Sequence, residues 1–245
     1  IFYYNTNLLE ALQLIDAADE SEIGALLVQY AGVLGIEAVP YTELNDPAII
    51  AQINKKLEQI DLSVDMDNLA ESIQSKVELL NEVYNQAIVP SYFADCDDAV
   101  KLAAFAEKYQ TEALLEGDPY FAKITDTSPF YRYLLQVREY TEEVSLDNSE
   151  WLQSLYHQTI VVYAINESDY RKIPEILEYY NEQGVIDVSL NAYNSLYSAA
   201  KQKVLQSLKA ENIVDVTQFA ARLAALCEAV ASDDDNHSHT GGGGG

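Results

Sequence analysis

Basic residues are scarce in this sequence. The 245 residues include 40 Asp and Glu against 14 Lys and Arg, which gives a formal net charge of −26. Nucleic-acid binding depends on Lys and Arg that neutralise phosphates, so the composition argues against a nucleic-acid partner. A surface of this sign fits a cation-rich medium outside the cell, a salty habitat or a basic protein partner.

Long apolar runs are also lacking. The segment TIVVYAI at residues 159–165 is far shorter than the ~20 residues that a membrane-spanning helix needs, so no membrane insertion is predicted. The chain shows no signal peptide, opens at Ile1 and has Met66 as its only methionine. We therefore expect a processed product or a piece of a longer protein.

Cysteine is limited to Cys96 and Cys227, too few for any multi-cysteine zinc pattern. The two thiols would form a disulfide if the fold brought them together. Two free thiols buried in helices are the alternative, because cysteine is commonly buried.

Catalytic signatures are missing as well. The histidines are His157, His237 and His239, and the sequence has no H-E-x-x-H, G-x-S-x-G, Walker or G-x-G-x-x-G motif. His157 lies on an apolar segment beside Trp151 and Tyr156, which is typical of a core or boundary position. His237 and His239, with the aspartates before them, have the residue types of a transition-metal site, but they lie in the predicted mobile tail, so no functional metal binding is predicted there. We predict that the protein is not an enzyme.

The sequence does contain abundant apolar residues and a repeated pattern. Apolar residues make up 49%, and Pro and Gly are sparse apart from the final glycines, which favours a helix-rich fold. Three segments match position for position: DESEIGALLVQY (19–30), DAVKLAAFAEKY (98–109) and DYRKIPEILEYY (169–180). Each combines an initial Asp with an apolar stripe, so Asp19, Asp98 and Asp169 are predicted to cap helices.

A second set of matching segments starts at residues 64, 144 and 214, so both sets repeat every 70 to 80 residues. Each unit is predicted to hold three helices: one from the Asp cap, one after a Tyr-x-x-Leu element and one at the second segment. The fold class is therefore all-α, with tandem repeats at residues 1–80, 81–156 and 157–231. The middle repeat is divergent and rich in aromatic residues. Residues 232–245 are acidic and end in glycines, and we expect a disordered tail or linker.

These segments resemble the tandem three-helix repeats of surface and S-layer-associated proteins of Gram-positive bacteria, and of some phage structural proteins. The resembling residues are LLEALQLIDAADESEIGALL with Leu34-Gly35-Ile36-Glu37, and more closely VSLNAYNSLYSAAKQKVLQSL with NIVDVTQFAARLAALCEAV. The likeness is best over 157–231, less close over 7–80 and weakest over 81–156. It implies a spacer or assembly module at the cell surface or in a virion, without catalytic residues.

Two acidic segments are similar to the start of a calcium loop. They place Asp65 near Asp67 and Asp95 near Asp97, but both lack the glycine and the final glutamate of an EF-hand. An irregular calcium site at these aspartates is one interpretation. Helix capping is the more economical one.

Tyrosine is the most unusual component, with 18 residues. Aromatic side chains gather in the middle repeat, where the sequence departs from the repeated pattern. Because aromatic rings with a polar edge favour interfaces, this segment is predicted to be a contact surface. Local packing of an enlarged loop is the alternative. The predicted contact residues are Tyr120, Phe121, Phe130, Tyr131 and Tyr133.

Taken together, the sequence predicts a structural or protein-interaction module of an extracellular assembly, such as a bacterial surface layer, a filament or an adhesin-like protein. Its partners would be further copies of itself or other structural subunits, and its self-assembly would depend on cations that neutralise the acidic surface. A phage structural protein is the alternative setting. A monomeric acidic module that binds a basic protein partner is the alternative function.

Overall fold

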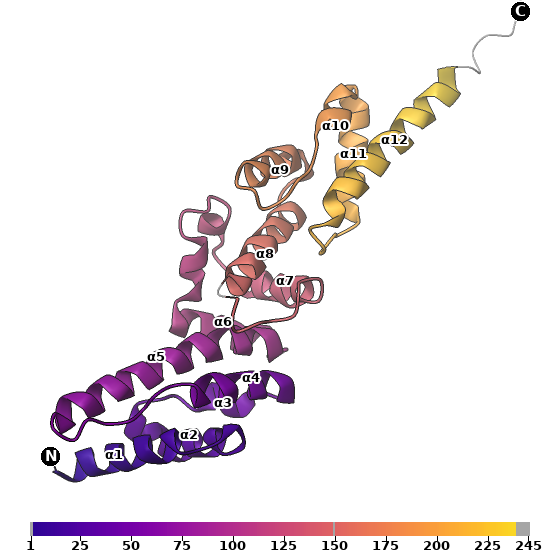
Figure 1. The fold of residues 1–245 in the computed structure, drawn as a ribbon. Helices are drawn as coiled ribbons and strands as arrows, with labels where there is room; N and C mark the ends of the chain where they lie inside the picture. Colours follow the sequence, from indigo (N-terminus) through magenta and orange to yellow (C-terminus); the bar gives the residue numbers. More distant parts are fainter. Residues whose placement is uncertain (1, 149, 239–245) are drawn as a thin grey trace, which may run out of the picture. The chain divides into compact units, whose positions relative to one another are not determined.

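The structure is a computed structural model that describes residues 2–148 and 150–238 (Figure 1). Within these ranges every regular element is a helix, so the predicted all-α fold class is confirmed. Among the same residues, no helix combines the length and the apolar character needed to cross a membrane.

The chain divides into two compact units, which we describe separately. The first unit extends to Tyr109 and includes Glu143–Leu152, and the second comprises Gln110–Glu142 and the chain from Gln153 onward. The first unit contains α1 (Phe2–Asp16), α2 (Glu20–Leu34), α3 (Val39–Glu43), α4 (Pro47–Glu58), α5 (Leu69–Asp95) and α6 (Ala99–Tyr109). The second contains the 3-10 helices η1 (Thr111–Leu115), η2 (Phe121–Lys123) and η3 (Tyr170–Lys172), together with α7 (Ser128–Arg138), most of α8 (Trp151–Glu167), α9 (Ile173–Glu182), α10 (Asn191–Ser195), α11 (Ser198–Ala210) and α12 (Gln218–Ser238).

In the first unit, α1 packs against α2 and α5, and α4 packs between α2 and α5 (Figure 1). Each helix contributes apolar side chains to one core because these residues recur at intervals of three and four. The fully buried members include Leu12, Ile23, Ile53, Leu80 and Ile88. This packing fixes the relative positions of the helices that form the surface features described below.

Helix α2 has a clear start and stop. The Asp19 carboxylate accepts a hydrogen bond from the Ser21 N–H at its start. At its end Gly35 adopts φ 70°, a left-handed conformation that glycine takes without a Cβ penalty. The Gly35 N–H donates to Ala31 O, which closes the last turn and redirects the chain toward α3.

A second glycine of α2 is required by packing. A Cβ atom at Gly24 would overlap the hydroxyl oxygen of Tyr41. That hydroxyl donates a 2.8 Å hydrogen bond to Asn54 Oδ1 on α4, and Asn54 is itself buried. The absence of a side chain at Gly24 thus lets α3 link α2 to α4.

In the second unit, α12 packs against α11 and α10, and η3 packs against α9 and α11. The segment TIVVY at 159–163 lies within α8, as the helix-periodic residues before it predict. Val161 and Val162 are fully buried, and the Thr159 hydroxyl donates to Leu155 O at 2.7 Å. This back-bond satisfies a polar group inside an otherwise apolar helix.

The predicted repeat boundaries after residues 80 and 156 fall inside helices, in α5 and α8 respectively. The predicted tail begins inside α12, which continues to Ser238, because extending an existing helix requires no new nucleation. The rest of the tail, including His239, lies outside the described residues. The His237 side chain also lies outside the described part of the structure.

Candidate functional site

The predicted capping aspartates lie at the starts of helices. Asp98 Oδ1 accepts hydrogen bonds from the backbone N–H groups of Val100 and Lys101 at the first turn of α6, at 2.8 and 3.2 Å. Asp169 accepts from the Arg171 N–H and so caps η3, which leads into α9. Hydrogen bonds from the Arg171 side chain and backbone hold the pKa of Asp169 well below its ordinary value. These contacts, like that of Asp19, satisfy donors that helix starts leave unpaired.

The aspartates considered for calcium are engaged locally. Just before α5, Asp65 accepts a hydrogen bond from the Asp67 backbone N–H at 2.9 Å and another from the Asn68 side-chain amide at 3.3 Å. Asp95, at the end of α5, accepts from the Asn45 N–H. Asp97 is exposed on the connection to α6. Within the described ranges, no group of three or more His, Cys, Asp or Glu side chains is arranged to hold a metal ion.

The predicted aromatic contact surface needs correction at two positions. Phe130 and Tyr131 are fully buried in α7, so they cannot meet a partner. The reason is a helical apolar stripe that includes Leu134 and Val137, which turns this part of α7 toward the interior of the second unit. Tyr120, Phe121 and Tyr133 are half-buried.

These rings pack mainly on one another. The Phe130 ring meets Phe121 edge-on at a centroid distance of 5.4 Å and lies 5.6 Å from the Tyr156 ring. Tyr120 contacts the Tyr180 ring at 5.6 Å. Edge-on and tilted rings at these separations stabilise a core, so local packing explains most of the aromatic residues in this segment.

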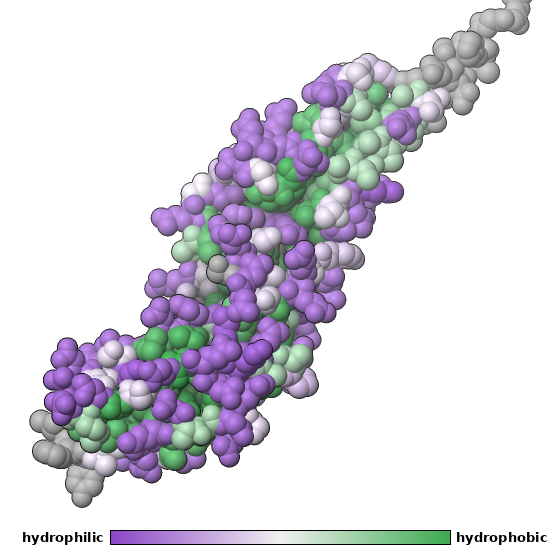
Figure 2. Space-filling view, viewed as in Figure 1, coloured by the Kyte–Doolittle hydropathy of each residue, from purple (hydrophilic) through white to green (hydrophobic). Residues whose placement is uncertain are grey.

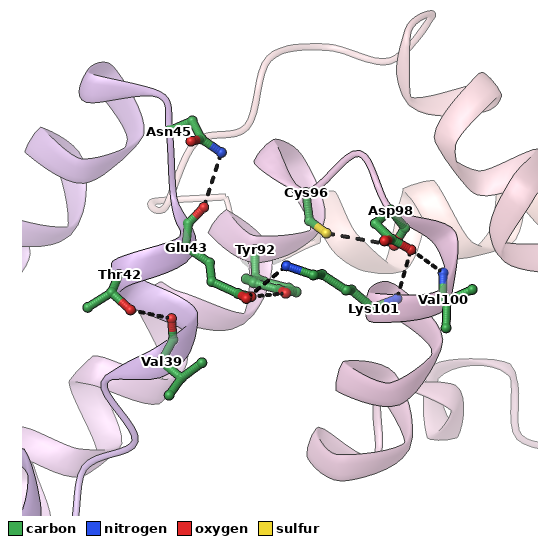
Figure 3. A network of polar contacts seen from close by, with 9 residues as sticks. All are labelled: Val39, Thr42, Glu43, Asn45, Tyr92, Cys96, Asp98, Val100 and Lys101. Atoms are coloured by element: carbon green, nitrogen blue, oxygen red, sulfur yellow. Dashed lines mark hydrogen bonds and ion pairs between the residues drawn. The ribbon is translucent and has the colours of Figure 1, made fainter.

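A polar hollow of about 300 Å³ in the first unit is lined by a network of hydrogen-bonded side chains (Figure 3). It lies where the end of α3 meets the last turn of α5 and the first turns of α6. The Glu43 carboxylate accepts a 2.6 Å hydrogen bond from the Tyr92 hydroxyl and a 2.8 Å bond from Lys101 Nζ. Cys96 Sγ lies 3.7 Å from Asp98 O on the same rim. Three helices are therefore joined through one carboxylate.

The chemistry of this hollow follows from those contacts. Hydrogen bonds from Lys101 and Tyr92 hold the pKa of Glu43 below its ordinary value, so the carboxylate stays ionised. Burial, with the bond to Glu43, raises the pKa of Tyr92, and the bond to Glu43 raises that of Lys101. The Tyr92 hydroxyl and the Lys101 ammonium group therefore each bind their proton more firmly than they would in water. This arrangement resists proton transfer and suits a structural link better than an acid–base pair.

Tyrosine hydroxyls bind carboxylates in the second unit too. Tyr131 donates to Glu112 at 2.8 Å, Tyr133 donates to Glu167 at 2.9 Å, and Tyr180 donates to Asp118 at 3.0 Å. The bonds to Glu112 and Asp118 are partly buried, whereas the bond to Glu167 is exposed. In a chain with few Lys and Arg, tyrosine hydroxyls thus supply donors to some of the partly buried carboxylates.

Cys96 and Cys227 do not form a disulfide. Cys227 is buried in α12, and burial raises the pKa of its thiol. Cys96 is half-buried at the end of α5. A raised pKa lowers the thiolate fraction, so Cys227 is poorly suited to nucleophilic chemistry.

One surface feature was missed by the sequence analysis: a hollow of about 520 Å³ between the start of α2 and one side of α4. We call it the α2–α4 groove. Pro47, Ile50 and Ala51 form its apolar part, Asn54 and Ser21 also line it, and its acidic residues are Asp19, Glu20 and Glu58. Figure 2 shows that hydrophilic residues cover much of the face drawn, with hydrophobic residues exposed between them. Since the groove depends on how two helices pack, one segment read alone does not reveal it.

No family model, curated protein or solved structure matches this chain.

Proposed function

We propose that the chain is a non-catalytic structural or protein-interaction module, built from three tandem helical units and working in an extracellular assembly such as a bacterial surface layer or filament. The proposal is supported by the order of the helices, in which a similar series can be aligned three times when η1 and η3 are set aside. In the first occurrence, a capped helix (α2) is followed by the short α3, the 12-residue α4 and the long α5. The second series is α6, η2, the 11-residue α7 and α8. The third is α9, α10, the 13-residue α11 and α12.

The third helix of each series has the same spacing of buried residues. Buried residues recur four apart in the third member of each series, at Ile49 and Ile53, at Phe130 and Leu134, and at Ala200 and Val204. In repeat proteins of this kind, each repeat buries its apolar side against the neighbouring repeats. Tandem copies therefore suit a structural spacer, which holds other parts of an assembly at a regular distance, better than a reaction centre. The compact units are two rather than three, and the long helices α5 and α8 run through the predicted boundaries after residues 80 and 156. The proposal therefore requires neighbouring repeats to share a helix.

The charge suggests what controls assembly. Two chains that each carry −26 repel one another, and cations that collect at the carboxylates reduce this repulsion. Calcium is proposed in that role, either diffusely or at the aspartates near residues 65 and 95. The phage setting remains an alternative environment for the same structural role.

A test is the solution mass of the purified chain by light scattering, in excess calcium, in excess magnesium and in chelator, all at one ionic strength. Growth to large particles in calcium alone supports an ion-controlled structural subunit. A constant monomer mass in every buffer argues against self-assembly and favours the second candidate, an acidic module for a basic partner. The net charge of −26 favours that candidate specifically, and its binding would fall steeply with added salt.

A further inference from the structure

The α2–α4 groove has a polar side chain at a buried position that is apolar in another helix of the chain. The buried residues of α4 (Ile49, Ile53, Asn54 and Leu57) are spaced like those of α11 (Ala200, Val204, Leu205 and Leu208). In this register Asn54 corresponds to Leu205, and both are buried. Because a buried amide costs free energy unless its hydrogen bonds are made, packing alone does not explain asparagine at this position.

The Asn54 amide is held in place, but its hydrogen-bonding capacity is not fully used. Its Oδ1 accepts the 2.8 Å bond from the Tyr41 hydroxyl, which has room only because residue 24 is glycine. Asn54 is 8% exposed and lines the groove, yet its Nδ2 group donates to no residue within the described ranges. A donor of this kind needs an acceptor. The backbone carbonyl of a peptide segment in the groove would be one.

The rest of the groove supplies an apolar wall and an acidic rim. Its volume of about 520 Å³ lies within the range of about 300 to 1,000 Å³ typical of binding pockets, and Ile50 and Ala51 are partly exposed there. Asp19 is engaged in capping α2, whereas Glu20 and Glu58 form no ion pair with another residue that the structure describes. None of the described residues that line the groove is basic. A matching occupant carries an apolar side chain next to lysine or arginine.

The chain itself has few basic side chains to place in such a groove. It contains 14 Lys and Arg against 40 Asp and Glu. Ion pairs within the chain already engage many of the basic residues, including Lys56, Lys76, Lys101 and Lys108. Two copies that each carry −26 also repel each other, whereas a basic segment is attracted from a distance. Charge complementarity therefore favours an occupant from a different protein.

We propose that the α2–α4 groove binds a segment of another protein in which an apolar side chain is flanked by lysine or arginine. Asn54 donates to a backbone carbonyl of that segment, and its apolar side chain packs on Ile50 and Ala51. Its basic side chains lie beside Glu20 and Glu58. This inference rests on the proposed role as a protein-interaction module and names the chemistry of the partner. The net charge speeds the encounter, while the amide and the apolar wall select the segment.

The first test measures the binding of three fluorescent peptides to the whole chain by anisotropy, at about 0.15 M salt, where the screening length is about 8 Å. The lysine–leucine peptide has the sequence Gly-Lys-Leu-Lys-Leu-Lys-Gly with both ends blocked. Serine replaces leucine in the second peptide, and glutamate replaces lysine in the third. The lysine–leucine peptide should bind at least tenfold more tightly than either of the others. Equal binding of the lysine–serine peptide, or no measurable binding of the lysine–leucine peptide, would overturn the proposal.

Variants of the groove locate the binding. Ile50→Ser should weaken binding of the lysine–leucine peptide at least tenfold. Val100→Ser, at a 75% exposed valine outside the groove, should leave it unchanged. Because Asn54→Leu alone would leave the Tyr41 hydroxyl without its acceptor, the amide is tested in a double variant with Tyr41→Phe. The double variant should bind at least tenfold more weakly than Tyr41→Phe alone, which keeps the Asn54 amide. Equal affinities within either pair would contradict the assigned contacts.

The carboxylates are tested at constant net charge. Glu20→Gln with Glu58→Gln should weaken binding at least tenfold. The control, Glu71→Gln with Glu107→Gln, removes the same charge at the first turn of α5 and near the end of α6, as the groove variant does for α2 and α4. Losses of the same size would show that the peptide responds only to the overall charge, which overturns the groove as the site. Circular dichroism checks that each variant is folded.

These tests separate the groove from self-assembly. Light scattering of the same variants in calcium and in chelator provides the second readout. Calcium-dependent growth of the wild-type chain without peptide binding overturns the groove proposal and leaves the proposed assembly intact. Groove-dependent peptide binding by a chain that stays monomeric in every buffer supports the groove and overturns the assembly. Loss of calcium-dependent growth in Ile50→Ser, but not in Val100→Ser, would identify a second copy as the occupant and overturn the assignment to another protein.

Discussion

The Tyr92 hydroxyl donates a 2.6 Å hydrogen bond to Glu43 Oε2, and the same carboxylate accepts a 2.8 Å bond from Lys101. Tyr92 lies on α5 and is only 4% exposed, with its ring stacked on Phe105 at 4.2 Å. The hydroxyl is thus positioned by the core, and it holds the end of α3 against α5. A buried donor that meets an ionised acceptor is among the stronger hydrogen bonds in proteins.

Tyr92→Phe removes this donor and keeps the ring. We expect the free energy of unfolding to fall by about 1 to 2 kcal/mol, because Glu43 would lose a charge-assisted hydrogen bond. Urea unfolding followed by circular dichroism measures the loss. Tyr140→Phe is the control, since Tyr140 is 54% exposed. Similar midpoints for the two variants would show that the Glu43 contact contributes little.

Alkaline pH should unfold the protein through its tyrosines. Burial raises the pKa of Tyr156 and Tyr133 to about 12, and also raises that of Tyr131. The ordinary value in an unfolded chain is about 10. Because the folded pKa is the higher one, the contribution to stability is fully present below about pH 10 and is lost as pH rises from 10 through 12. Above that range the unfolded state is favoured.

Measurement of near-ultraviolet tyrosinate absorbance and helical circular dichroism on the same samples tests this expectation. A substantial part of the tyrosinate signal should develop only as helicity is lost. Complete titration near pH 10 with helicity unchanged would show that the buried hydroxyls are accessible in the folded state.

The helix starts could be predicted from sequence because capping is local. An Asp followed by an apolar stripe was sufficient to locate Asp19, Asp98 and Asp169, and each accepts a hydrogen bond within two or three residues. The link between Tyr92 and Glu43 joins positions 49 apart and required the fold. The same is true of the α2–α4 groove, which forms only where two helices pack.

The misreading of Phe130 and Tyr131 has a different cause. These residues were treated as surface because their segment departs from the repeated pattern. The spacing of Phe130, Leu134 and Val137 nevertheless follows an apolar helical stripe, and that signal was present in the sequence. Pro129 near the start of α7 also agrees with a helix, since proline is favoured in the first turn.

The corrected position of Phe130 leads to a prediction about stability. Phe130→Ala should lower the free energy of unfolding by about 3 to 5 kcal/mol, because it leaves a cavity among packed rings. Phe121→Ala, at a half-buried neighbour in contact with Phe130, should cost less. Denaturant unfolding of both variants provides the comparison, and Phe130→Leu serves if the alanine variant does not fold. A negligible loss for Phe130→Ala and Phe130→Leu alike would mean that this ring is not part of the core.

Two glycines in α2 give the sharpest comparison, because the same substitution should have opposite effects. At Gly24 an added Cβ overlaps the Tyr41 hydroxyl, so Gly24→Ala should displace Tyr41 from Asn54 and destabilise the first unit. At Gly32 no atom lies within 4 Å of an added Cβ, and alanine is the better helix former there. Gly32→Ala should therefore stabilise the protein by about 0.5 to 1 kcal/mol. Both changes are measured by urea unfolding. A stabilised Gly24→Ala variant would show that Tyr41 moves aside without loss, and that the link from α3 to Asn54 is dispensable.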